Sequence, residues 1–179
     1  MGRIIEALGD EIDNTLILLS ADHGELLGDY GCVGKRCMLD AACRVPLVVR
    51  YPKNFAAGEQ CNTPVSLLDI YPTFLSHAHC DESTVCNEGL PLQQIADNKS
   101  GRDATFSQFQ TGSYGLYMIS TATHKYLFSA ADQREWFFDL QRDPLEKQDQ
   151  SENPDDADIL ATLKARLIKR MSEGDDQQL

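Results

Sequence analysis

The spacing of apolar residues changes several times over the first hundred residues. Over residues 2–9 the apolar positions fall on one face of a helix. Residues 15–20 are instead continuously apolar at their centre, which is typical of a strand covered on both faces in a parallel sheet. Residues 45–50 form a second β-branched run. The pattern therefore predicts an α/β unit near the start of the chain.

Between and after these strands the signals are shorter. Residues 24–44 indicate a loop with short helical pieces, and residues 92–96 suggest one short helix. Residues 66–76 predict a longer helix, because Ser66 and Asp69 stand at the two positions of a capping box. Pro72 is expected either to kink this helix or to lie in its first turn.

After residue 100 the pattern becomes that of short, aromatic-rich strands. Four runs recur at a spacing of about ten residues, which predicts an antiparallel meander: residues 105–110, 114–121, 124–129 and 135–140. Apolar positions from Ile159 to Ile168 then predict an amphipathic helix. The predicted fold class is α/β: an incomplete doubly wound sheet, then a small antiparallel sheet with one C-terminal helix. The predicted domains are residues 1–100 and 101–179.

Composition and charge narrow the class of protein. Of the 179 residues, 42% are hydrophobic and 25% are charged, which is ordinary for a globular protein. Sixteen basic and 28 acidic residues give a net charge of −12. This charge disfavours nucleic acid and anionic membranes as partners. No apolar run approaches the roughly 20 residues that a membrane span needs.

The six cysteines are irregularly spaced, and none forms a C-x-x-C pair, which argues against a zinc ribbon. Cys80 and Cys86 flank a short polar loop and could form a disulfide in an oxidising compartment. Cys37 and Cys43 are expected to be buried as small apolar residues. The cluster His77-Ala78-His79-Cys80 could bind a metal, but it is better explained as a helix end followed by a loop.

The most informative residues are Asp22 and His23, which follow the first apolar strand. Open α/β sheets bind their ligands beyond the carboxyl ends of the strands. Adjacent oxygen and nitrogen donors at such an end suggest a divalent-metal site and chemistry on a phosphate or sulfate ester. The alternative is that His23 only orients a turn.

Lys35 follows after a loop that contains four glycines. Glycines allow the backbone and its side chains to approach a ligand closely. A lysine brought back to an anion would neutralise charge on the oxygens of that anion. Taken alone, Lys35 would be an ordinary surface lysine; after Asp22 and His23 it becomes a candidate for anion binding.

These motifs, in this order, resemble the sulfatases of the alkaline phosphatase superfamily over nearly the whole chain. The resemblance rests on residues 14–31 (NTLILLSADHGELLGDYG), Gly34-Lys35, residues 44–50 (RVPLVVR), residues 64–73 (PVSLLDIYPT), residues 118–127 and residues 138–146. It implies that Asp22 and His23 are metal ligands, with calcium the usual ion and manganese or magnesium as alternatives. It also implies that Lys35 contacts sulfate oxygens as a catalytic and substrate-binding residue. Tyr30 stands among the substrate contacts, where many relatives carry histidine.

The departures from the family limit this expectation. Sulfatases convert a cysteine in C-x-P-x-R or C-x-A-x-R to formylglycine, and no cysteine here has that context. The aspartate pair that supplies the family's other metal ligands is also missing. We therefore expect the C-terminal part of a sulfatase with half of a metal site, inactive alone. Exposed apolar surface would favour a homo-oligomer, and the parent would be periplasmic, secreted or lysosomal.

Two alternatives remain open at this point. A phosphonate or phosphodiester hydrolase of the same superfamily carries a similar D-H-G segment followed by lysine. A non-catalytic interaction module could instead keep Asp22 and His23 as relics. Metal binding and parallel rates on sulfate and phosphate esters would separate these hypotheses.

Overall fold

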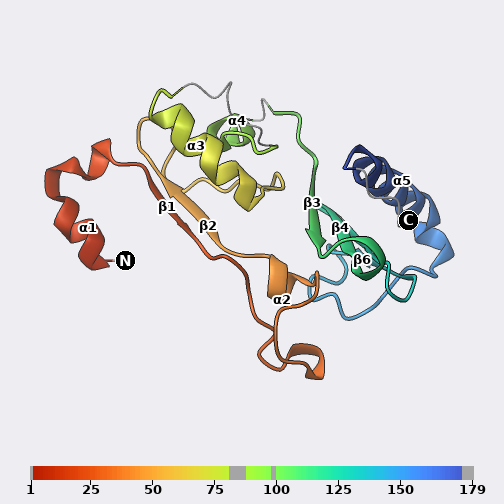
Figure 1. Cartoon of the computed structure of the whole chain (residues 1–179). Helices are drawn as coiled ribbons and strands as arrows, with labels where there is room; N and C mark the ends of the chain where they lie inside the picture. Colours follow the sequence, from red (N-terminus) through yellow and green to blue (C-terminus); the bar gives the residue numbers. More distant parts are fainter. Residues whose placement is uncertain (1, 81–87, 98–99, 175–179) are drawn as a thin grey trace. The chain divides into compact units, whose positions relative to one another are not determined.

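The computed structural model describes residues 2–80, 88–97 and 100–174 (Figure 1). The chain divides into two compact units. Unit 1 comprises residues 1–22 and 46–101, and unit 2 comprises residues 23–45 and 102–179.

Unit 1 begins with the predicted helix and two strands. The elements are α1 (Gly2–Leu8), the 3-10 helix η1 (Gly9–Asn14), β1 (Ile17–Ser20) and β2 (Leu47–Arg50). β1 and β2 pair antiparallel, with Leu19 opposite Val48. These two side chains are 43% and 56% exposed. The expectation of a strand in a parallel pair, covered on both faces, is wrong for this pair, because an apolar run does not specify the direction of its neighbour.

The second half of unit 1 is helical. It contains the 3-10 helix η3 (Leu67–Asp69), α3 (Ile70–His77) and α4 (Leu92–Ala96). The capping box is confirmed, since the Ser66 hydroxyl accepts from Leu68 N and the Asp69 carboxylate accepts from Ser66 N. Pro72 lies in the first turn of α3, where its missing N–H costs no hydrogen bond.

Unit 2 contains the predicted meander and its helix. Its elements are η2 (Asp29–Gly31), α2 (Asp40–Cys43), β3 (Ala104–Phe109), η4 (Gly112–Tyr114), β4 (Leu116–Thr121), β5 (His124–Ser129), β6 (Arg134–Asp139), η5 (Pro154–Asp156) and α5 (Ala157–Glu173). The strands form one antiparallel sheet in the order β3-β4-β5-β6. The predictions of the meander and of the C-terminal helix are confirmed.

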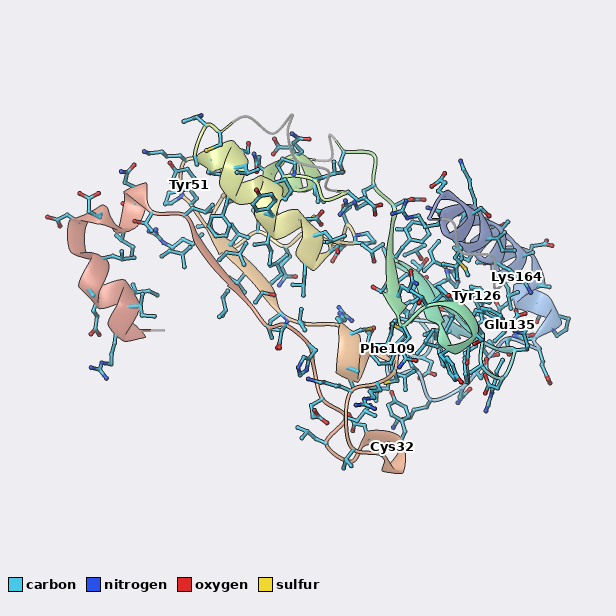
Figure 2. The ribbon with its side chains drawn as sticks, viewed as in Figure 1. Cys32, Tyr51, Phe109, Tyr126, Glu135 and Lys164 are labelled. Atoms are coloured by element: carbon cyan, nitrogen blue, oxygen red, sulfur yellow. The ribbon has the colours of Figure 1, made fainter. Side chains whose placement is uncertain are left out.

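The two faces of this sheet cover different parts of unit 2, because successive side chains of a strand point to opposite faces. One face carries Tyr126 and Phe137, which pack with Leu163 and Leu167 of α5. In Figure 2, Tyr126 and Glu135 lie close to Lys164 of α5, and Lys164 Nζ is 2.5 Å from Glu135 Oε1. The opposite face packs against the segment that contains α2 and is lined by Met38, Met118, Leu127 and Phe138, with Cys43 beside them.

The cysteine and histidine predictions have mixed outcomes. Cys37 and Cys43 are half-buried, not buried, and Cys43 packs at the edge of the second cluster. His77 ends α3, and the residues after it form a turn, as expected. Cys86 lies outside the described residues, so its pairing with Cys80 stays a prediction.

Several apolar side chains of unit 1 are exposed. More than a third of the residue surface is exposed in Val65, Leu67, Leu68, Tyr71 and Phe74.

In the part of the chain that the structure describes, no helix has the length and apolar character to cross a membrane.

Candidate functional site

The segment from His23 to Val45 carries most of the candidate site, and it belongs to unit 2. Asp22 and His23 follow β1 after Ala21, and both are exposed. Beyond them the chain makes a loop, and the short helix α2 then returns it toward β2.

The imidazole of His23 has a defined orientation. Its Nδ1 lies 2.8 Å from the carbonyl oxygen of Gly24. Because a carbonyl can only accept, this bond places a proton on Nδ1 and leaves a lone pair on Nε2. The ammonium of Lys35 contacts Nε2 directly. The structure thus brings together two of the predicted site residues.

A tight hairpin returns Lys35 to His23. Leu26 N donates to Gly34 O at 2.9 Å, and Gly28 N donates to Cys32 O at 2.9 Å. Gly28 and Gly34 have φ values of 107° and 103°, a region that favours glycine. Cys32 lies near the end of this hairpin in Figure 2. The glycines noted in the sequence therefore make the return of Lys35 sterically feasible.

Tyr30 has a hydrogen bond of its own. Its hydroxyl donates to the carbonyl of Leu145 at 2.5 Å. The pKa of Tyr30 is raised, mainly by burial and to a smaller extent by the negative charges of Glu146 and Asp29. The phenol is therefore neutral and tethers the hairpin to the turn after β6. The substrate contact that the resemblance implies for Tyr30 stays a prediction.

Sequence reasoning missed a buried ion cluster beneath this segment. Lys125 on β5 is 1% exposed. Its Nζ contacts Asp40 Oδ1 directly, lies 2.5 Å from Glu146 Oε1 and donates to Met38 O at 3.2 Å. Glu146 Oε2 also accepts from the backbone N–H of Asp40 at 2.5 Å. The only signal in the sequence was a lysine inside an aromatic strand.

The charges of this cluster are unequal, because two carboxylates share one ammonium. Burial alone would lower the pKa of Lys125, but Cys43, Glu146 and Asp40 raise it above its ordinary value. Burial, with a smaller repulsion from Asp40, raises the pKa of Glu146. Burial also raises the pKa of the Cys43 thiol to about 11, so this thiol is neutral at pH 7 and is no activated nucleophile.

The turn after His23 is closely packed. Gly24 N donates to Ala42 O at 2.7 Å, and a Cβ on Gly24 would lie 2.1 Å from Ala41 O. We expect Gly24→Ala to destabilise unit 2 by about 1–3 kcal/mol, because backbone must move to admit the methyl group. The single tryptophan, Trp136, is the probe for urea unfolding. Gly2→Ala is the control, since nothing lies within 4 Å of its added Cβ; equal midpoints for the two variants would contradict the prediction.

The donors present fit part of a divalent-metal site. Asp22 offers a carboxylate, and His23 carries its lone pair on Nε2, the atom that Lys35 contacts. Among residues 2–80, 88–97 and 100–174, no group of three or more metal-binding side chains occurs. Asp22 and His23 are therefore two candidate ligands, and they do not complete a metal site among the described residues.

Comparison with known proteins identifies the class. Residues 28–173 match the family described as N-sulphoglucosamine sulphohydrolase, C-terminal. The match covers most of the chain, and the chain belongs to this sulfatase family. Its fold agrees with the alkaline-phosphatase-like fold of its structural neighbours.

Individual relatives agree with this assignment. The chain is 28% identical to an arylsulfatase of Clostridium perfringens over 96% of its own length and 37% of that protein. BT4656, solved in complex with its substrate D-glucosamine-2-N,6-O-disulfate, superposes with a TM-score of 0.83 at 26% identity, covering 99% of this chain and 39% of that one. The phosphonate monoester hydrolase of Silicibacter pomeroyi superposes with a TM-score of 0.82 at 26% sequence identity, again covering 99% of this chain and 39% of that one. The chain thus spans less than half the length of these relatives.

Proposed function

We propose that this chain supplies the lysine and one pair of metal ligands to the active site of a sulfuric ester hydrolase. Lys35 would bind the sulfate oxygens, and Asp22 and His23 would hold a divalent cation, calcium first and manganese or magnesium as alternatives. The observation that carries the proposal is the contact between Lys35 Nζ and His23 Nε2. Membership of the sulfatase family supports it.

The orientation of the side chains explains how they would act. The Gly24 carbonyl holds the proton of His23 on Nδ1, so the lone pair of the ring is on Nε2, which Lys35 contacts. A cation bound at Nε2 would take the place of this contact. Lys35 brings a positive charge with three donors to the same place, where the oxygens of an ester would gain negative charge. A bound cation would add Lewis-acid charge to the same oxygens.

The nucleophile is expected in a part that this sequence does not contain. None of the six cysteines stands in a formylglycine context. We therefore expect little or no hydrolysis of an aryl sulfate by the purified chain. Metal-dependent turnover by this chain would contradict that expectation and would require another nucleophile.

Metal binding tests the proposal directly. We expect calorimetry to detect weak Ca²⁺ or Mn²⁺ binding, because only part of a ligand set is present, and Asp22→Ala or His23→Ala to abolish it. Asp132→Ala is the matched control, since it removes an exposed carboxylate from the turn between β5 and β6. Wild-type chain that binds neither ion would overturn the metal part and favour the non-catalytic interaction module.

A phosphonate or phosphodiester hydrolase is the second candidate. It is favoured by the likeness to the phosphonate monoester hydrolase of Silicibacter pomeroyi, which is as close in fold as the sulfatase neighbours. Parallel rates of a full-length parent on matched sulfate, phosphate and phosphonate esters decide between the candidates. Faster hydrolysis of the phosphonate would overturn the proposed sulfuric ester hydrolase activity.

A further inference from the structure

The segment from His23 to Val45 contains little regular structure of its own, yet it must hold His23 and Lys35 in register. Its described helices are the short elements η2 and α2. Hydrogen bonds within the segment close the hairpin, and further contacts come from the rest of unit 2. Two contacts reach it from the turn after β6, through Leu145 and Glu146.

These two contacts hold two different parts of the segment, around Tyr30 and around Asp40. The hydroxyl of Tyr30 donates to Leu145 O near the tip of the hairpin. Glu146 Oε2 accepts from Asp40 N at the start of α2. Neighbouring residues of one turn thus hold the hairpin and the helix that follows it.

Lys125 joins this turn to the sheet. Its ammonium contacts Glu146 from the turn, and Asp40 and Met38 O from the segment. A fully buried ammonium is strongly unfavourable unless it is paired and hydrogen-bonded, and here all of its partners lie in these two loops. Displacing either loop would leave Lys125 underpaired, so the cluster selects one position for the segment.

The cluster is linked to His23 by a short path. Asp40 opens α2, and Ala42 of the same helix accepts from Gly24 N. Gly24 in turn follows His23 and accepts from its Nδ1. Every residue on this path belongs to unit 2.

We propose that Lys125 and Glu146 are positioning residues: they hold the His23–Lys35 segment on the C-terminal sheet, and they contact neither metal nor substrate. The mechanical part of this proposal rests on the contacts above. Its relevance to catalysis rests on the proposed function of His23 and Lys35. The C-terminal sheet thereby acquires a role in shaping the site, in addition to its stability.

Amide hydrogen exchange of the 179-residue chain tests the mechanical part. We expect Lys125→Met to lower the protection of the Gly24 and Asp40 amides at least tenfold more than that of the β4–β5 amides. Lys164→Met is the matched control. It removes a lysine of α5 that pairs with Glu135 of β6, on the other face of the sheet. Lys164→Met should leave the protection of the Gly24 and Asp40 amides unchanged relative to that of the β4–β5 amides.

Two further variants keep the test decisive. Glu146→Gln is nearly isosteric and serves if Lys125→Met does not fold, with the same expected pattern. Lys125→Met combined with Glu146→Gln should restore part of the protection at Gly24, because it removes both members of the buried pair. The proposal would be overturned if, in the variant that folds, the Gly24 amide loses no more exchange protection than the β4–β5 amides do.

Binding of inorganic sulfate separates the mechanical part of the proposal from its relevance to the site. If the wild-type chain binds sulfate through Lys35, Lys125→Met should raise the dissociation constant about tenfold, while Lys164→Met leaves it unchanged. If the wild-type chain binds no sulfate, the proposed function of Lys35 loses support, but the exchange experiment still decides the positioning role. An unchanged sulfate affinity in a variant whose segment is deprotected would overturn the link to the site.

Discussion

Asp69→Ala is expected to unfold the helical half of unit 1. Asp69 is 0% exposed, and its two carboxylate oxygens accept from Ser66 N at 2.7 Å and from Leu90 N at 2.8 Å. Truncation leaves two backbone donors without these acceptors. At about 1–3 kcal/mol for each unsatisfied buried group, the expected cost is about 2–6 kcal/mol.

The same region contains a second buried polar side chain, Thr73, which makes two hydrogen bonds. Thr73 Oγ1 donates to Asp69 O at 2.6 Å and accepts from Leu92 N at 2.9 Å. Gly89 packs so closely that a Cβ there would lie 2.0 Å from Leu68 O. α3 and the segment that leads to α4 are therefore held by backbone and polar contacts more than by a large apolar core.

Site-resolved amide exchange is the measurement for Asp69→Ala. The Ser66, Leu90 and Leu92 amides should lose their protection together, while Asp10→Ala, at an exposed carboxylate of η1, should leave them unchanged. Asp69→Asn should fall between the two, because it keeps one acceptor oxygen. Protection at Leu90 that survives Asp69→Ala would show that another acceptor replaces the carboxylate.

Local chemistry made parts of this structure predictable from the sequence. The capping box of Ser66 and Asp69 was predicted because both of its bonds lie within four residues. The meander was predicted because four short, aromatic-rich runs recur at a spacing of about ten residues, which is typical of consecutive antiparallel strands. The contact of His23 with Lys35 is consistent with the glycines of the hairpin, which permit a close return of the chain.

Non-local pairing was not predictable in the same way. The run of residues 15–20 indicates a strand but not the direction of its neighbour, and β1 pairs antiparallel with β2. The buried partners of Lys125 are even less apparent, since Asp40 and Glu146 are distant in the sequence. A lysine in an apolar strand signals a buried ion pair only once the fold supplies the opposing carboxylates.

The adjacent residues Phe137 and Phe138 allow the two faces of the sheet to be tested separately. Phe137 is 0% exposed and packs on the α5 side, whereas Phe138 is 3% exposed and packs with Met38 on the side of the site segment. Each Phe→Ala substitution should cost about 3–5 kcal/mol of unfolding free energy, because each removes a buried ring and leaves a cavity. Urea unfolding should therefore show comparable destabilisation for the two variants.

The local consequences should differ although the total costs are similar. Phe138→Ala should deprotect the Gly24 and Asp40 amides before the rest of the sheet and expose the Cys43 thiol to an alkylating reagent above pH 8. Phe137→Ala should instead deprotect Leu163 and Leu167 of α5 first. A site segment that responds equally to both substitutions would mean that the sheet transmits packing changes as one rigid body. The apolar face around Phe138 would then have no separate part in holding His23 and Lys35.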